Sequence, residues 1–359
     1  MPHCNARPGG NVAGAGIVAG VQCADVTRGG GDGTMKEGGI RSMAHKILMN
    51  SVRVSGREDF VRTFLRERGC ELIEHDHSQL LERAEVLRLI GDASGYLASL
   101  DRVNAEFYDA APMLRVVSAQ GVGYDHIDVE EATRRGVAVC TCAGGNNRSV
   151  AELAFAMILG LARQVRAVDA GVRDGEWPRL VGTELWGKTI GIVGLGRVGK
   201  STALIARGFG MRILATDVKW DITFADQHGI SYVPLPRLLA ESDFLSLHCP
   251  LTPQTRGMID EAAIEQMKPT AFLINTARGP IVKEAALVGA LRERMIAGAG
   301  LDVFEVEPHP ANPYRDLPNT IMTSHLGGAT HESDARTLEL ALLNITQVLL
   351  GGEPVHRVN

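Results

Sequence analysis

Three polar side chains in the second half of the chain stand shortly after runs of apolar residues. They are Arg278, Glu307 and His325. The runs before them, which we predict to be strands, cover residues 271–275, 299–301 and 320–323. Loops that follow parallel strands lie at one edge of a sheet, so we expect the three side chains to converge there.

These residue types suit one reaction. The planar guanidinium of Arg278 can pair with a carboxylate through two parallel hydrogen bonds. The imidazole of His325 titrates near neutral pH and can give a proton to a carbonyl oxygen as a hydride arrives. A carboxylate such as Glu307 orients an imidazole and favours its charged form. Together they would serve the reduction of a 2-keto acid, or the reverse reaction.

A glycine-rich segment upstream indicates where the hydride would come from. Residues 189–193 form a predicted buried strand that runs into Gly194-Leu-Gly196-Arg-Val-Gly199, and a predicted helix continues to Gly210. The first glycine allows a tight turn, the second lets the backbone approach a pyrophosphate, and the third lets the helix pack against the strand. The helix N-terminus adds free N–H groups and a positive partial charge. This context predicts a dinucleotide site.

Asp217 refines the choice of dinucleotide. It ends the next predicted strand, residues 212–216, about 20 positions after the glycines, where an acceptor for a ribose hydroxyl is expected. Its charge repels the additional phosphate of NADP, so we predict NAD. Lys219, two residues further on, partly offsets this repulsion.

The elements that would position these residues alternate between strand and helix in two series, from Lys46 onward and from Thr189 to about Met322. In the first series we predict strands at 46–50, 71–74, 96–98 and 115–119, and helices at 57–68, 78–89 and 104–111. A long apolar helix follows, with Ser149 and Glu152 as an S-x-x-E capping box at its start. The alternation predicts an α/β fold of two Rossmann-like, doubly wound parallel-sheet domains with a cleft between them.

The predicted elements divide the chain into three parts. Residues 1–42 are glycine-rich without apolar periodicity, and we predict a disordered tail, with the true start at Met1, Met35 or Met43 left open. Residues 43–145 together with 331–359 would form a flavodoxin-like substrate-binding domain. Residues 146–330 would form the NAD-binding Rossmann domain. The two ligands would meet in the cleft, because open α/β sheets bind ligands at the carboxyl ends of their strands.

Bulk composition is that of a globular cytoplasmic protein. Of the 359 residues, 45% are hydrophobic and 22% charged, and the formal net charge is −5. This charge favours neither nucleic acid nor an anionic membrane as a partner, and no apolar run reaches the roughly 18 residues of a membrane span. The cysteines are scattered, and Cys140 and Cys142 have no partners at zinc spacing, so we expect neither a disulfide framework nor a metal site.

Several longer motifs accompany the glycine fingerprint. They are Gly121-Val-Gly-Tyr-Asp-His-Ile-Asp128, Gly144-Gly-Asn-Asn-Arg-Ser-Val-Ala-Glu152, Ser246-Leu-His-Cys-Pro-Leu-Thr252, Asn275-Thr-Ala-Arg-Gly279, Asp302-Val-Phe-Glu-Val-Glu-Pro308 and Ser324-His-Leu-Gly-Gly328. With these motifs the chain, from about Lys46 to its end, resembles the D-isomer-specific 2-hydroxyacid dehydrogenases. The branch it resembles includes phosphoglycerate dehydrogenase and glyoxylate/hydroxypyruvate reductase.

The resemblance implies roles for the matching residues. His325 would be the acid/base, with Glu307 rather than Glu305 as its partner, and Arg278 would grip the substrate carboxylate. The backbone N–H groups of Val122 and Gly123 would hold the same carboxylate from the other domain. The implied cofactor contacts are Gly194, Gly196, Arg197, Val198 and Gly199 at the pyrophosphate, Asp217 at the ribose, Cys249 and Pro250 on the adenine side, Asp302 at the nicotinamide carboxamide, and Thr276, Ala277, Leu326, Gly327 and Gly328 by position. The family also implies a homodimer, as does the apolar circumference of the helix at 149–164.

The chain departs from the family pattern at two places. Ala143 stands where the hinge usually has proline, and His126 stands where asparagine is frequent; we interpret His126 as structural. Ala98 occupies a position where phosphoglycerate dehydrogenases often carry arginine, with Arg102 as the nearest basic residue. This favours a small unphosphorylated acid of the glyoxylate or hydroxypyruvate type. D-3-phosphoglycerate remains an alternative substrate, and a non-enzymatic NAD-sensing corepressor is the alternative of another class.

Overall fold

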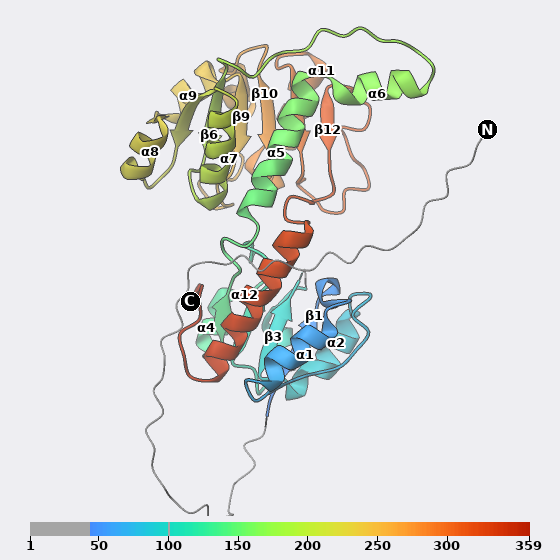
Figure 1. Ribbon diagram of the computed structural model, residues 1–359, viewed down its shortest axis with the longest axis vertical. Helices are drawn as coiled ribbons and strands as arrows, with labels where there is room; N and C mark the ends of the chain where they lie inside the picture. The colour runs from blue at the N-terminus through green and yellow to red at the C-terminus, as the bar shows by residue number, and fades with distance from the viewer. Residues whose placement is uncertain (1–43, 100) are drawn as a thin grey trace, which may run out of the picture. The chain divides into compact units, whose positions relative to one another are not determined.

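The computed structural model describes residues 44–99 and 101–359, and the tail predicted at residues 1–42 lies outside them. The described residues form two parallel sheets flanked by helices (Figure 1). Buried hydrophobic side chains pack on both faces of each sheet. The predicted α/β class with doubly wound sheets is therefore confirmed.

The first sheet has five strands in the order β2-β1-β3-β4-β5. Its strands are β1 (His45–Asn50), β2 (Cys70–Leu72), β3 (Gly95–Ala98), β4 (Val116–Ala119) and β5 (Ala138–Cys140), and all neighbouring pairs are parallel. This is the flavodoxin-like order, in which ligands bind where the order reverses, here between β1 and β3. Asn50, at the end of β1, and Asp101, shortly after β3, are hydrogen bonded to each other.

Helices cover both faces of this sheet, because successive strand residues point to opposite sides. One face packs against α2 (Arg83–Leu89), α3 (Ala105–Asp109), α4 (Val129–Arg134) and the 3-10 turn η2 (Ile90–Asp92). The other packs against α1 (Glu58–Arg66), α12 (His331–Leu349) and the 3-10 turn η1 (Val52–Val54). The last helix thus returns to the first sheet, and the amide of Val358 beyond it donates to the carbonyl of Val139 in β5.

The second sheet has seven strands in the order β12-β11-β10-β9-β6-β7-β8. They are β6 (Thr189–Val193), β7 (Arg212–Thr216), β8 (Ile230–Tyr232), β9 (Phe244–Leu247), β10 (Phe272–Asn275), β11 (Gly298–Leu301) and β12 (Thr320–Met322). The order reverses between β6 and β9, as in dinucleotide-binding Rossmann domains. β6 is buried along its whole length, which a central parallel strand with helices on both sides requires.

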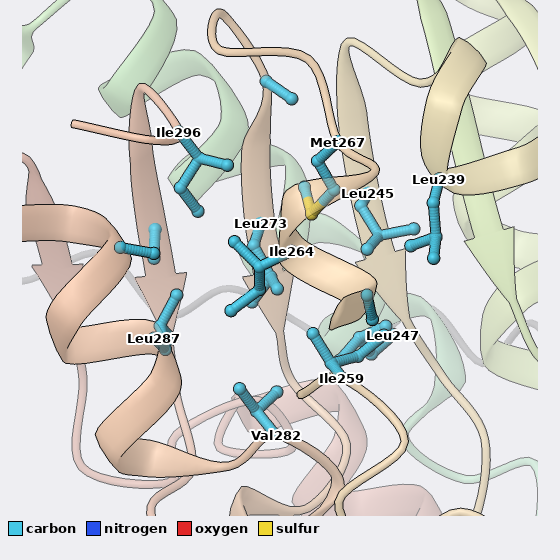
Figure 2. Close-up of a cluster of buried hydrophobic side chains, with 14 of the residues drawn as sticks. Leu239, Leu245, Leu247, Ile259, Ile264, Met267, Leu273, Val282, Leu287 and Ile296 are labelled. Atoms are coloured by element: carbon cyan, nitrogen blue, oxygen red, sulfur yellow. The ribbon is translucent and has the colours of Figure 1, made fainter. Parts of the chain in front are cut away.

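One face of this sheet packs against α9 (Leu235–Glu241), α10 (Glu261–Glu265) and α11 (Glu284–Arg292), with the 3-10 turn η3 (Gly279–Ile281) before α11. Figure 2 shows this core, where Leu245 and Leu247 of β9 and Leu273 of β10 meet Ile264 and Leu287 from the helices. The other face packs against α5 (Asn147–Ala162), α7 (Arg197–Gly208) and α8 (Ile222–His228).

The capping box predicted at the start of α5 is wrong. The helix begins at Asn147 with Asn146 as its N-cap, so Ser149 lies inside the first turn, and Glu152 is exposed. Gly144, with φ of 93°, turns the chain two residues before this N-cap. The Ser149 hydroxyl instead lies 2.9 Å from that of Thr330, the N-cap of α12. The two connections between the sheets are therefore joined by a hydrogen bond.

A solvent-exposed segment follows α5. Gln164 adopts a left-handed conformation, α6 (Val165–Arg173) comes next, and the chain runs without further regular structure to β6. Six of its large apolar side chains are exposed to solvent: Val165, Val172, Trp177, Leu180, Val181 and Trp186. Across the residues that the structure describes, no helix combines the length and apolar character needed to cross a membrane.

Candidate active site

His325 and Glu307 are directly paired. The His325 Nδ1 lies 2.7 Å from Glu307 Oε2, while Glu307 Oε1 accepts a hydrogen bond of 2.8 Å from the Phe304 amide. Both side chains are partly exposed, at 46% and 33%, so solutes can reach the imidazole. Glu307 is thus the carboxylate on this histidine, and Glu305 is an exposed neighbour on the same loop.

The pair shifts the proton affinity of both partners. The hydrogen bond to Glu307 raises the pKa of His325 above its ordinary value, against the opposing effects of burial and of Arg278. Burial acts to raise the pKa of Glu307, but its hydrogen bonds with His325 and with the Phe304 amide leave that pKa below its ordinary value. The arrangement therefore favours an imidazolium beside a carboxylate near neutral pH.

Asp302 holds the loop that presents His325. Its buried carboxylate accepts hydrogen bonds from the Thr323 hydroxyl at 2.5 Å, the Leu326 amide at 2.6 Å and the Gly327 amide at 2.8 Å. Its carbonyl accepts from the His325 amide at 2.8 Å. His325 itself has φ of 57°, a left-handed conformation that the surrounding bonds must maintain. The sequence alone does not indicate a role for Thr323, because its hydrogen bond to Asp302 depends on the fold.

Arg278 projects from the end of β10 toward the first sheet. Asn275 closes the turn below it, donating to the Arg278 carbonyl at 2.9 Å and accepting from the Ala277 amide at 3.1 Å. A Cβ atom placed on Gly123 would lie 1.6 Å from Arg278 Nη2, so only glycine allows this approach. Arg278 also lies close enough to His325 and Glu307 to affect the pKa of each. The structure therefore brings the three side chains together with the loop of Val122 and Gly123.

The glycine loop has the geometry of a dinucleotide cradle. Gly194 has φ of 91° and packs on the backbone of Cys249, and a Cβ on Gly199 would lie 2.1 Å from the Gly194 carbonyl oxygen. A Cβ on Gly196 would meet nothing within 4 Å, which leaves open space at the start of α7. The Asp217 carboxylate accepts from the Leu195 amide at 2.6 Å, at the edge of this loop. These residues fit a nucleotide diphosphate and its ribose.

The remaining candidate contacts surround this loop or the His325 loop. The stem of Arg197 lies by Gly144, where a Cβ would be 3.6 Å from Arg197 Cδ, and Val198 is half-buried in the first turn of α7. Cys249 and Pro250 follow β9, the strand beside β6.

Thr276 has a buried hydroxyl without a partner among the described residues, beside the half-buried Ala277. Leu326 is exposed, Gly327 packs on Asp302, and Gly328 lies next to the Asn146 side chain.

His126 and the Cys140–Cys142 pair make none of the hydrogen bonds described above. His126 is largely buried, its Nε2 has no partner among the described residues, and burial lowers its pKa. Cys140 and Cys142 are buried, with unpaired thiols. Within residues 44–99 and 101–359, no three histidine, cysteine or acidic side chains are arranged to hold a metal ion.

Known proteins resemble this chain over most of its length. Residues 155–327 match the family model described as "D-isomer specific 2-hydroxyacid dehydrogenase, NAD binding domain". The glyoxylate reductase of Korarchaeum cryptofilum is 41% identical over 315 residues, which cover 84% of this chain and 95% of that protein.

Solved structures show the same similarity. The TT0316 protein from Thermus thermophilus superposes with a TM-score of 0.78 at 36% identity, covering 88% of this chain and 100% of that one. A D-isomer specific 2-hydroxyacid dehydrogenase from Lactobacillus delbrueckii ssp. bulgaricus, in its NAD-complexed form, superposes with a TM-score of 0.72 at 26% identity and the same coverages of 88% and 100%.

Proposed function

The chain belongs to the D-isomer-specific 2-hydroxyacid dehydrogenases, and from that premise we propose that it reduces glyoxylate or a similarly small 2-keto acid to the D-2-hydroxy acid. It is an NAD-dependent oxidoreductase. The proposal rests on the close approach of Arg278 to the Gly123 loop, beside His325, whose Nδ1 is hydrogen bonded to Glu307.

Different residues bind the substrate and transfer the proton. Arg278 and the amides of Val122 and Gly123 bind the substrate carboxylate, which places the keto group toward His325. The cofactor, when bound, supplies the hydride that adds to C2. Because Glu307 holds Nδ1, the His325 proton that passes to the carbonyl oxygen is the one on Nε2. One hydride and one proton thereby reach the substrate, and the neutral histidine takes up a new proton from solvent.

The cofactor contacts named above are part of this proposal. The fingerprint glycines with Arg197 and Val198 would hold the pyrophosphate, Asp217 the ribose, and Cys249 and Pro250 the adenine side. Asp302 would reach the nicotinamide carboxamide through lone pairs that its three present hydrogen bonds leave free. Thr276, with its unpartnered hydroxyl, and Ala277 would lie along the same path.

A substrate panel tests the activity. Oxidation of NADH is followed with glyoxylate, hydroxypyruvate, pyruvate and phosphohydroxypyruvate, with His325→Ala as the control for background turnover. Highest kcat/KM with glyoxylate or hydroxypyruvate is expected. A clear preference for phosphohydroxypyruvate would indicate a phosphoglycerate dehydrogenase instead. Binding of NADH without turnover of any acid would point to an NAD-sensing corepressor.

We also propose a homodimer formed along α5. A groove beside this helix is lined by Ala156, Gly160, Val165, Arg166, Asp169, Ile321 and Met322. The exposed apolar side chains of residues 165–186 lie on the neighbouring segment. Apolar surface gathered in this way fits burial against a second copy of the chain.

The division into domains and the cellular location are also proposals. Residues 43–145 with 331–359 are taken as the substrate-binding domain and 146–330 as the NAD-binding domain. The packing of α12 against the sheet of β1–β5 supports this division.

A cytoplasmic location is supported by the unpaired thiols of Cys70, Cys140, Cys142 and Cys249, and fractionation of the native host would test it.

A further inference from the structure

Asp125 has no role in the proposed function, yet it touches Arg278. Its Oδ2 lies 2.9 Å from Arg278 Nε, and the two residues are 153 positions apart in the chain. Asp125 belongs to the loop after β4 of the first sheet, and Arg278 follows β10 of the second. From this contact we infer that Asp125 is a positioning residue, which aligns the Arg278 guanidinium for the carboxylate of the substrate. The inference rests on the proposed role of Arg278.

The hydrogen bonds of the guanidinium define its orientation. Nε donates to Asp125, and Nη1 donates to the Ala277 carbonyl at 2.7 Å. Nη2 donates to none of the residues that the structure describes and lies against Gly123. A planar group that is held at Nε and Nη1 cannot rotate in its plane. The donors that remain free are thus those nearest the Val122–Gly123 loop.

This orientation is the one that a carboxylate needs. An incoming carboxylate can take an N–H from Nη2 on one side and the backbone amides of the loop on the other. Without Asp125, the long arginine side chain would have several rotamers of similar energy, and binding would have to select one of them. Alignment before binding reduces that entropic cost.

The exposure of both side chains argues against a purely structural ion pair. The side chains of Asp125 and Arg278 are 55% and 29% exposed, and ion pairs so accessible to water add little to folding stability. The neighbouring His126 has its pKa lowered by burial, so it is neutral and does not compete for the Asp125 carboxylate. The charged groups facing Arg278 are then Asp125 on one loop and Glu307 with His325 on another.

Two substitutions separate alignment from charge. Asp125→Asn keeps the shape and an oxygen that accepts from Nε, whereas Asp125→Ala removes the acceptor. Glu130→Ala serves as the matched control, because it removes a carboxylate from the adjoining helix α4. Each full-length variant is measured for kcat and KM with glyoxylate, for NADH affinity by fluorescence, and for melting temperature.

We expect Asp125→Ala to raise KM for glyoxylate by on the order of 10- to 100-fold, as misplacement of a binding group does. Asp125→Asn should recover most of that loss. NADH affinity and melting temperature should stay near those of the unmutated enzyme, as for Glu130→Ala. A lower KM in Asp125→Ala would overturn the inference, because Asp125 would then be a competitor that the substrate must displace. An unchanged KM would overturn it too.

A double-mutant cycle shows whether Asp125 acts through Arg278. In an Arg278→Ala background, Asp125→Ala should have almost no further effect, since nothing remains to be aligned. An equal effect in both backgrounds would contradict the inference. The cycle also separates it from the proposed function: if Arg278→Ala alone leaves KM unchanged, the proposed carboxylate site is wrong. If Arg278→Ala weakens binding and Asp125→Ala does not, only the role of Asp125 is wrong.

Discussion

Single side chains in this site owe their chemistry to particular neighbours. Glu307 raises the pKa of His325, and the imidazole is therefore protonated over a wider range of pH. A histidine with a raised pKa stays protonated as the pH rises toward that pKa, and it loses its proton above it. The alkaline limb of kcat/KM for keto-acid reduction should report this titration.

The first prediction concerns that limb. Glu307→Gln retains the shape of the side chain and removes its charge, so the imidazolium loses its support and the limb should move to lower pH. The measurement is kcat/KM for glyoxylate as a function of pH, with Glu305→Gln as the matched control. His325→Ala should reduce kcat by about 10²- to 10⁴-fold, the usual contribution of general acid catalysis. A limb that stays in place in Glu307→Gln would show that this carboxylate does not tune the histidine.

The second prediction concerns the cofactor. Asp217→Ala removes both the acceptor for a ribose hydroxyl and the charge that repels the additional phosphate of NADPH. The preference for NADH over NADPH, expressed as a ratio of kcat/KM values, should fall by about 10- to 100-fold, the range for a lost hydrogen bond to a charged group. Asp226→Ala, an exposed carboxylate on α8, is the control. Equal use of both cofactors by the unmutated enzyme would refute the assignment.

The roles of some of these residues could be predicted from the sequence, and those of others could not. Arg278, Glu307 and His325 could be found because each follows a recognisable strand, and parallel strands align their ends. The role of Asp125 could not be predicted from the sequence, because a contact across 153 residues leaves no local signal. Thr323 was missed for the same reason, since its bond to Asp302 exists only once β11 and β12 are neighbours.

Among the elements, α7 shows how closely a helix can depend on one glycine. A side chain on Gly199 would press on the Gly194 carbonyl, whereas one on Gly208, at the end of the same helix, would meet nothing within 4 Å. The N-terminus of α7 can approach the cofactor loop only as far as its third fingerprint glycine permits.

The third prediction uses this difference. Gly199→Ala should push α7 away from the loop and weaken NADH binding, measured as the dissociation constant, by more than about tenfold, or about 1.4 kcal/mol. Gly208→Ala should leave NADH affinity unchanged and alter the free energy of unfolding by at most about 1 kcal/mol. Similar NADH affinities for the two variants would mean that the close contact at Gly199 does not position the phosphate site.

The strands were easier to predict from the sequence than the start of α5. Buried parallel strands are short apolar runs, and the runs predicted at 189–193 and 212–216 coincide with β6 and β7. The S-x-x-E pattern at Ser149 was misleading, because serine within a first helical turn can equally bond to another element. Here that element is Thr330, from a distant part of the chain.

At the scale of the whole molecule, the fourth prediction concerns assembly. Ala156→Glu places a charge in the groove beside α5 and should shift the protein from a dimer toward the mass of one 38.5 kDa chain in light scattering. Ala262→Glu on the exposed side of α10 is the matched control and should remain dimeric. A monomeric unmutated protein at micromolar concentration would refute the proposed interface.

The return of α12 to the first sheet has a consequence during synthesis on the ribosome. All strands of the second sheet lie between Thr189 and Met322, so that sheet can be completed while the chain is still growing. The first sheet begins earlier but lacks Leu338, Leu342 and Ile345, which cover the face formed by Ile47 and Met49, until α12 has emerged. Contacts between such distant segments form late. The earliest strands to be made are therefore among the last to be covered, and a nascent chain that ends at Thr330 would expose that apolar face to chaperones and proteases.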